Sequence, residues 1–317
     1  MAKSVLALRL ASLIAGIGLF VGCAGPAGPS GSSGSSSPVE SGSPSATAKG
    51  PALVVDGPVA VTPDRELLVK CYGTGAPTIL LEAGGTTSNL TNWPATFMQT
   101  LAETTTACAY SRAGGEGSTP VAGLLSRKVI VDDAFTLLDR LHQQYGVSGP
   151  YLLVGWSFGG SVILAEALEH PELTAGLIAL DTNFPVDYMK VCTASGRPKP
   201  ECQEGYDEDK EAKSIEKDIA DRGHPLPNIP ITEVSAMQLD DCSTAPGEKS
   251  VSYEVAGVIL TAPDCEALAT KIAEKNFRDW RQLGPQVKEL RVQATHDGLI
   301  DQAGPEIITI IKGILRR

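Results

Sequence analysis

The chain has 317 residues, 42% of them hydrophobic, so it can bury a sizeable core in one large domain or two small ones. Its formal net charge is −11 at pH 7. A nucleic-acid-binding protein normally has the opposite sign, with clustered Lys and Arg. The composition therefore speaks against nucleic acid as a partner.

The N-terminus has the pattern of a secretory signal. Lys3 and Arg9 form a short basic region, and the apolar run Leu10–Val21 follows it. The run ends in Phe20-Val21-Gly22-Cys23, which resembles the bacterial lipobox, in which a Cys after a small residue is lipidated. Phe20 stands where that motif usually has Leu. We therefore expect residues 1–23 to be a lipoprotein signal peptide and Cys23 to carry the lipid.

Residues 24–50 consist almost entirely of Gly, Ser, Pro and Ala. Such a segment cannot bury a core and is typical of a disordered linker. It separates the signal from residues 51–317, which we expect to form the folded domain. The pattern predicts an exported protein that is lipid-anchored to the outer face of the cell membrane, and it assigns no oligomeric state.

Seven cysteines are present, and six remain when Cys23 is set aside. An even number of cysteines in an exported chain indicates disulfides, and six allow 15 connectivities. Neighbourhood in the sequence favours Cys71–Cys108, Cys192–Cys202 and Cys242–Cys265. No group of Cys and His has the spacing of a zinc site.

Short apolar runs alternate with helical patterns after residue 51, which predicts a mainly parallel sheet with helices on both faces. The predicted strands are Val59–Val61, Leu67–Tyr72, Thr78–Glu82, Ala107–Tyr110, Tyr151–Val154, Leu177–Leu180, Gly257–Thr261 and Leu290–Ala294. The predicted helices are Trp93–Glu103, with Asn92 as its N-cap and Pro94 in its first turn, then Val129–Tyr145, Phe158–Glu169 and Pro305–Leu315.

One stretch interrupts this alternation. Residues 184–252 are long, polar and rich in Pro and charge. Loops of this length are usually functional lids or insertions, so we expect a cap here.

Ser157 lies in Gly155-Trp156-Ser157-Phe158-Gly159, between a predicted strand and a predicted helix. A nucleophile on a sharp strand-to-helix turn needs small neighbours, because the backbone there is strained and closely packed. The turn exposes the hydroxyl at the head of a helix. We therefore predict that Ser157 is a catalytic nucleophile.

A serine is a weak nucleophile unless a base takes its proton. The chain has four His, and His142, His170 and His224 lie in a helix, at a helix end and in the expected cap. His296 follows the last predicted strand and precedes the final helix. This is where a base sits when the chain order is Ser, Asp, His, so His296 is the predicted base.

Two carboxylates at strand ends are candidates for the acid that orients the base. Asp181 ends the strand next to the nucleophile strand. Asp264 follows what we expect to be the penultimate strand, where it could also cap a helix. Either could reach His296, so the sequence pattern leaves both acids open.

An oxyanion also needs donors, since negative charge develops on the carbonyl oxygen in acyl transfer. The backbone N–H of Phe158 follows the nucleophile directly. Gly85 follows a predicted strand within Glu82-Ala83-Gly84-Gly85, and its N–H is the second candidate.

Four stretches together resemble the α/β-hydrolase superfamily: residues 80–85 (Leu80 to Gly85), 110–114 (Tyr110 to Gly114), 149–160 (Gly149 to Gly160) and 296–302 (His296 to Gln302). The resemblance covers residue 54 to the C-terminus apart from the cap. It implies an eight-stranded sheet with one antiparallel strand near an edge, a cap after strand six, and a Ser-His-Asp mechanism without metal or other cofactor. The family at large places its acid after strand seven, which favours Asp264. The branch with Glu-Ala-Gly at the oxyanion loop often places it after strand six, which favours Asp181. The resemblance therefore leaves the two acids nearly even, with a slight lean to Asp181.

The predicted function is hydrolysis of a small-molecule carboxylic ester through an acyl-enzyme. Two alternatives stay open at this point. One is a peptidase or amidase of the same fold. The other is a surface-binding lipoprotein that has lost activity, against which the presence of Ser157, His296 and the acid candidates argues.

Overall fold

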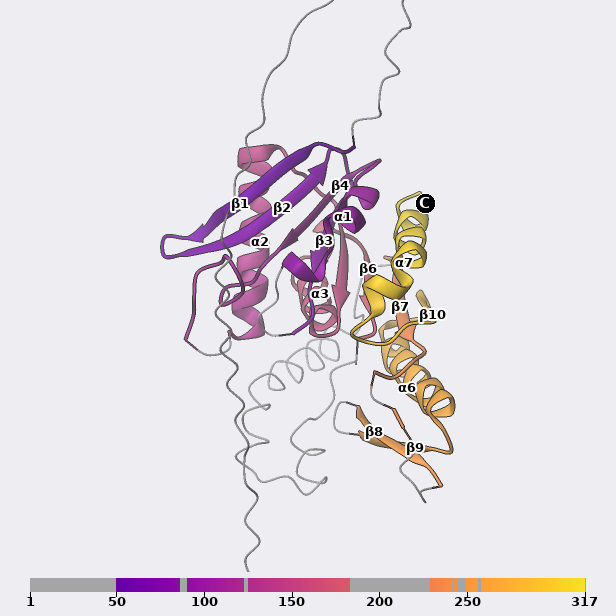
Figure 1. Cartoon of the computed structure of the whole chain (residues 1–317). Helices are drawn as coiled ribbons and strands as arrows, with labels where there is room; N and C mark the ends of the chain where they lie inside the picture. Colours follow the sequence, from indigo (N-terminus) through magenta and orange to yellow (C-terminus); the bar gives the residue numbers. More distant parts are fainter. Residues whose placement is uncertain are drawn as a thin grey trace, which may run out of the picture. The chain divides into compact units, whose positions relative to one another are not determined.

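The computed structural model describes residues 50–85, 90–122, 125–182, 229–240, 242–243, 249–255 and 258–316. All of them belong to one compact unit, Ala48–Arg317. The unit is built on an eight-stranded sheet with the strand order β1-β2-β4-β3-β5-β6-β7-β10 (Figure 1).

The strands of this sheet are mostly parallel, as predicted. β2 runs antiparallel to both of its neighbours, and every other pair in the order from β4 to β10 is parallel. The single antiparallel strand therefore lies one position from an edge, as the family resemblance implies. The strands are β1 (Leu53–Thr62), β2 (Arg65–Gly73), β3 (Thr78–Glu82), β4 (Thr106–Tyr110), β5 (Tyr151–Trp156), β6 (Thr174–Leu180), β7 (Ile231–Ala236) and β10 (Val287–Val292).

Helices pack on both faces of the sheet and give the unit two hydrophobic cores. α2 (Arg127–Tyr145), α3 (Phe158–Glu169) and the end of α6 (Cys265–Trp280) share one core. α1 (Ala95–Leu101) and α7 (Leu299–Leu315) share the other. Within the described residues, three short 3-10 helices occur at η1 (Leu90–Asn92), η2 (Pro171–Leu173) and η3 (Arg281–Leu283).

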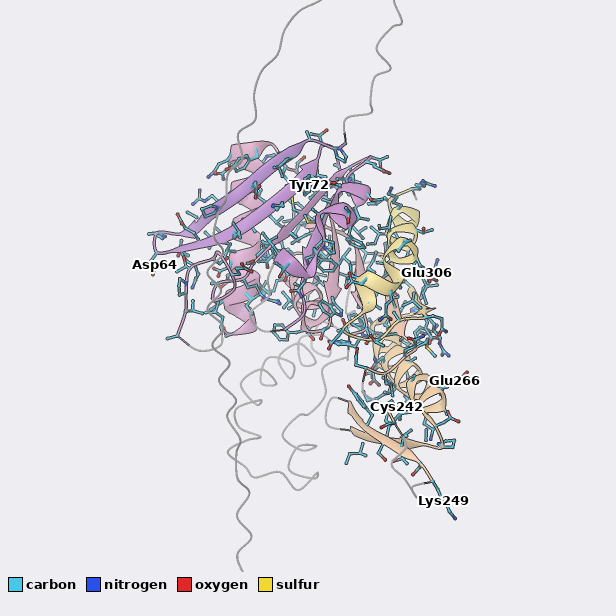
Figure 2. The ribbon with its side chains drawn as sticks, viewed as in Figure 1. Asp64, Tyr72, Cys242, Lys249, Glu266 and Glu306 are labelled. Carbon is cyan, nitrogen blue, oxygen red and sulfur yellow. A yellow bond between two sulfur atoms is a disulfide. The ribbon has the colours of Figure 1, made fainter. Side chains whose placement is uncertain are left out.

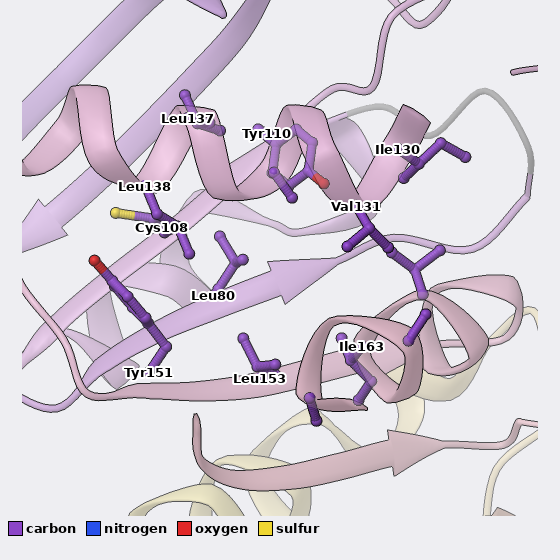
Figure 3. Packing of buried hydrophobic residues seen from close by; sticks show 14 of the residues in the cluster. Leu80, Cys108, Tyr110, Ile130, Val131, Leu137, Leu138, Tyr151, Leu153 and Ile163 are labelled. Atoms are coloured by element: carbon purple, nitrogen blue, oxygen red, sulfur yellow. The ribbon is translucent and has the colours of Figure 1, made fainter. Parts of the chain in front are cut away.

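The central strands are buried along their whole length because helices cover both faces. All five residues of β3 and of β4 are buried. Figure 3 shows Leu80 and Leu153 from neighbouring strands packed beside Leu137 and Leu138 of α2. Burying one such Leu side chain contributes about 1.5–3 kcal/mol, so this layer holds the nucleophile strand firmly.

One strand lies inside the segment that the sequence assigns to the cap. β7 pairs with β6 and β10, so residues 231–236 belong to the main sheet. Its polar side chains Thr232, Glu233 and Ser235 are 3%, 0% and 1% exposed. A strand that is buried on both faces normally has a continuous apolar run, and these polar residues interrupt it, so the sequence pattern does not reveal β7.

The predicted strand 257–261 is not part of the main sheet, and this expectation was wrong. β9 (Val258–Ala262) pairs instead with β8 (Val251–Val255) in a separate antiparallel hairpin. The hairpin packs on α6 through a small apolar cluster that includes Val251 and Leu268. Figure 1 shows it beside α6, and Figure 2 labels Cys242 near the start of that helix.

Two of the three predicted disulfides are confirmed. Cys71 and Cys108 are directly opposite each other on β2 and β4, and a disulfide joins them. A second disulfide joins Cys242 to Cys265. Cys192 and Cys202 lie outside the described residues, as does Cys23.

Three helix starts differ from the prediction, and one of them is that of α2, which begins at Arg127 and not at Val129. α1 begins after Pro94, which is its N-cap in place of Asn92. α7 begins at Leu299 and contains Pro305 on its exposed side. Pro305 has no N–H and cannot donate a helical hydrogen bond. The apolar residues on the buried face of α7 lie four apart, and their packing stabilises the helix although this bond is missing.

Candidate active site

Ser157 lies at the turn between β5 and α3, where the motif predicts it. Its backbone has φ 53° and ψ −122°, a region that residues with a side chain rarely adopt. Such strain costs about 1–3 kcal/mol and persists only where the surroundings impose it. Here the N–H of Ser157 donates to the carbonyl of Leu180, at the end of β6, at 3.0 Å. The turn therefore holds the hydroxyl at the carboxyl edge of the sheet.

The glycines around Ser157 are required by close packing. A Cβ on Gly155 would lie closer than 3.0 Å to the backbone of Gly159. A Cβ on Gly159 would lie as close to the backbone of Glu82, and one on Gly160 as close to the side chain of Thr182. The sharp strand-to-helix turn at Ser157, called the elbow below, can form only because these positions have no side chain.

His296 is in contact with both predicted partners. It lies in the loop between β10 and α7, and its Nε2 is 3.0 Å from Ser157 Oγ. Its Nδ1 is 2.6 Å from Asp181 Oδ2. When Nδ1 carries the proton and donates to Asp181, Nε2 is left to accept the proton of Ser157.

The loop that carries His296 is fixed by its own hydrogen bonds. Gln302 Oε1 accepts from the Thr295 N–H at 3.0 Å, and Thr295 Oγ1 accepts from the Gly298 N–H at 3.1 Å. These bonds tie both sides of His296 to the first turns of α7. The imidazole is therefore presented from a rigid position, which a general base needs.

Asp181 follows β6 and is held by two hydrogen bonds to the neighbouring strand β7. Its N–H donates to the carbonyl of Val234 at 2.7 Å, and its Oδ1 accepts from the Ala236 N–H at 3.0 Å. Its φ is 46°. One carboxylate oxygen is thus anchored to β7, and the other is left to face His296.

Asp264, the alternative acid, is placed elsewhere. Its side chain accepts from the Ala267 N–H at 2.8 Å and is the N-cap of α6. It follows the β8–β9 hairpin and not the penultimate strand of the sheet. Of the two candidates, the structure brings only Asp181 to His296.

Negative charge surrounds the imidazole. Burial disfavours the charged ring, but the hydrogen bond and charge of Asp181, with the charges of Asp297 and Asp240, raise the pKa of His296 above its ordinary value. Asp240 Oδ1 accepts from the Asp297 N–H at 3.2 Å. The sequence does not single out Asp240, because the strand that precedes it, β7, is itself not recognisable.

The predicted oxyanion donors flank the nucleophile. Phe158 is the first residue of α3, so its N–H lies at the positive end of the helix dipole. Gly85 has φ 70°, and it follows Gly84, where a Cβ would lie 3.1 Å from the Ser157 Cβ. The Gly84-Gly85 loop is therefore packed directly against the elbow.

Among the described residues, no group of three or more His, Cys, Asp or Glu is arranged to hold a metal ion. No helix within the described ranges is long and apolar enough to span a membrane. Most of the expected cap, residues 183–228, lies outside the part of the chain that the structure describes.

No family model matches the sequence, and no curated protein resembles it at the sequence level. Solved structures do resemble it. Alpha/beta hydrolase domain-containing protein 10 from mouse is 15% identical, with 84% of this chain and 98% of that chain covered and a TM-score of 0.52. An esterase from Pyrococcus furiosus is 12% identical, with 84% and 90% covered and a TM-score of 0.53.

The enol-lactonase from Burkholderia xenovorans LB400 is also similar, at 14% identity. The match covers 81% of this chain and 99% of that chain, with a TM-score of 0.51. Identities this low establish a shared fold. Together with the sheet order and the single antiparallel strand, they show that the chain has an α/β-hydrolase fold.

Proposed function

We propose that this chain, with its α/β-hydrolase fold, is a serine hydrolase that cleaves a carboxylic ester through an acyl-enzyme. The observation that carries the proposal is the continuous line of hydrogen bonds from Asp181 to His296 to Ser157, at 2.6 Å and 3.0 Å. A nucleophile, a base and a group that orients the base are the three parts that acyl transfer needs.

In the acylation step, Ser157 Oγ attacks the ester carbonyl carbon while His296 Nε2 takes its proton. The carbonyl oxygen becomes negative and is held by the N–H groups of Phe158 and Gly85. His296 then gives its proton to the leaving alcohol oxygen as the C–O bond breaks. Asp181 keeps the Nδ1 proton in place and stabilises the imidazolium that exists between the two transfers.

In the deacylation step, water replaces the serine. His296 takes a proton from the water as its oxygen attacks the acyl carbon. The same two N–H groups hold the second oxyanion. Ser157 then leaves with the proton from His296, which restores the free enzyme and releases the carboxylic acid.

An ester is favoured over an amide by the kind of proteins that share the fold. One similar structure is described as an esterase and another as an enol-lactonase, and a lactone is a cyclic ester. The test compares turnover of p-nitrophenyl esters of increasing acyl length with turnover of aminoacyl anilides. We expect esters to be cleaved faster, and the Ser157→Ala protein to cleave neither.

Preferential cleavage of anilides would make the chain a peptidase or amidase and overturn the ester assignment. Absence of any Ser157-dependent turnover would contradict a catalytic role of Ser157, His296 and Asp181 and would favour a binding protein. Matching the Ser157→Ala protein to wild type by melting temperature ensures that a lost activity reports chemistry and not unfolding.

We also propose that the protein is exported and anchored to the outer face of the cell membrane through lipid on Cys23. Disulfides persist in oxidising compartments, and the Cys71–Cys108 and Cys242–Cys265 bonds support export. The test is metabolic labelling with an alkyne fatty acid. Label should enter the wild-type chain and not the Cys23→Ala chain; equal labelling of both would contradict the anchor.

A further inference from the structure

The oxyanion loop cannot anchor itself. Its residues Ala83, Gly84 and Gly85 have no polar side chain, and Gly84 must stay small because a Cβ there would lie 3.1 Å from Ser157 and 3.2 Å from the ring of Trp156. A Gly-Gly peptide has wide conformational freedom. Something outside the loop must therefore decide where the Gly85 N–H points.

The side chain of Arg112 contacts this loop on both sides of Gly84. Arg112 follows β4 and is 2% exposed. Its Nη2 donates to the carbonyl of Ala83 at 2.6 Å and to the carbonyl of Gly85 at 2.7 Å. Because each peptide unit is planar, these bonds orient the peptide before Gly84 and the peptide after Gly85. The Gly85 N–H belongs to the peptide between them, so its direction is constrained from both ends.

The same guanidinium also lies against the side chain of Phe158, the residue that supplies the other proposed donor. The Arg112 Cζ lies 5.2 Å from the centroid of the Phe158 ring, within the range of a cation–π contact. Next to it in the chain, Ser111 Oγ accepts from the Leu90 N–H at 3.0 Å, which ties down the chain beyond the loop. One short segment after β4 thus contacts the carbonyls of the loop, the ring of Phe158 and the chain at Leu90.

Arg112 itself lies against a buried acid. Its Nη1 is 3.4 Å from Glu82 Oε2, and Glu82 is 1% exposed. Burial raises the pKa of both Glu82 and Glu166, while the charge of Arg112 acts in the opposite direction on each. Of these two acids, Glu82 is the one that forms an ion pair with the buried guanidinium.

We propose that Arg112 is a positioning residue that orients the Gly84–Gly85 peptide toward the oxyanion, an inference that rests on the proposed function. A lysine keeps the charge but has one ammonium group in place of the planar guanidinium. Arg112→Lys should therefore not form hydrogen bonds to both carbonyls at the same time. Removing a whole oxyanion donor costs about 10²–10³-fold in kcat. A misdirected donor should cost about 10-fold or more, with little change in KM.

The experiment measures kcat and KM for a p-nitrophenyl ester together with Ki for a trifluoromethyl ketone. Ser157 Oγ adds to the ketone carbon and leaves a negative oxygen where the oxyanion forms. The variants are Arg112→Lys and Arg112→Met. The matched control is Arg65→Lys, because Arg65 forms another ion pair with a carboxylate, Asp133, at 2.9 Å between β2 and α2.

We expect both Arg112 variants to lower kcat and to raise Ki by the same factor, while Arg65→Lys leaves both unchanged. Should Arg112→Met fail to fold, Arg112→Lys decides. A lower melting temperature with kcat and Ki within about twofold of wild type would show a purely structural role and overturn the inference. A wild-type protein without Ser157-dependent turnover would instead refute the proposed function.

Discussion

The replacement of Asp181 by Asn probes the geometry of the triad in detail. In the structure Asp181 Oδ1 accepts from the Ala236 N–H, while Oδ2 faces His296 Nδ1. An Asn side chain must keep its oxygen toward the Ala236 N–H, so its NH₂ group turns toward Nδ1. The imidazole then moves its proton to Nε2 and can no longer accept the proton of Ser157.

This reversal of the tautomer should lower kcat by about 10³–10⁴-fold near neutral pH, with KM little changed. At 1.36 kcal/mol per decade, that is about 4–5.5 kcal/mol of lost transition-state stabilisation. The assay is turnover of a p-nitrophenyl ester by protein of confirmed fold. Asp264→Asn is the matched control: Asn caps a helix as well as Asp does, so activity should stay within about twofold.

A wild-type rate in Asp181→Asn, or a large loss in Asp264→Asn, would refute this account of the acid. The first result would mean that His296 is oriented by another group. The second would mean that the carboxylate seen at the start of α6 moves to the imidazole during catalysis.

Three further predictions follow from the surroundings of the triad. Burial, joined by the charge of Asp181, raises the pKa of Glu233 from 4.5 to about 8. Between these two pH values the folded protein keeps a proton that the unfolded chain releases, so the free energy of unfolding falls as pH rises from 4.5 to about 8. The free energy of unfolding of Glu233→Gln, measured by urea denaturation, should equal that of wild type near pH 4.5. Above pH 8 it should be a few kcal/mol higher, at about 1.4 kcal/mol per pKa unit; the same pH dependence in both proteins would contradict this. Asp240→Asn removes a negative charge that raises the pKa of His296, so the acidic limb of the kcat/KM profile should move to lower pH, and an unmoved limb would show that this charge does not reach the base. Gly155→Ala places a Cβ against the backbone of Gly159 and should lower the free energy of unfolding by at least about 1–3 kcal/mol, whereas a wild-type melting temperature would show that the elbow has room.

The parts of the fold with strong local signals could be predicted from the sequence. Apolar runs such as residues 78–82 and 151–154 read directly as buried strands, and they are strands in the structure. The elbow around Ser157 was equally readable, because the glycines that it needs are part of the motif.

The parts that depend on contacts distant in sequence could not be predicted. Thr232, Glu233 and Ser235 are buried in β7, although the same residue types in isolation resemble a loop. Because β7 was not recognised, the predicted strand 257–261 took its place as the penultimate strand, and this kept Asp264 open as an acid. The pairing of β7 with β6 and β10 and the contact of Asp181 with His296 show which carboxylate faces the imidazole.

The contacts of Arg112 also depend on residues that are distant in the sequence, and so could not be predicted from it. The sequence places it in a stretch typical of the superfamily, but its two bonds to Ala83 and Gly85 join segments about 30 residues apart. No local pattern reports such a contact, since it exists only after β3 and β4 have paired.

The proposed mechanism requires Ser157 to be a nucleophile that His296 activates. A fluorophosphonate reacts with such a serine, so the folded protein is incubated with this reagent and the adduct is located by mass spectrometry. We predict a single adduct on the peptide that contains Ser157, none in Ser157→Ala, and labelling in His296→Ala that is slower by orders of magnitude. Labelling that is absent from wild type, or that persists unchanged in Ser157→Ala, would contradict the account.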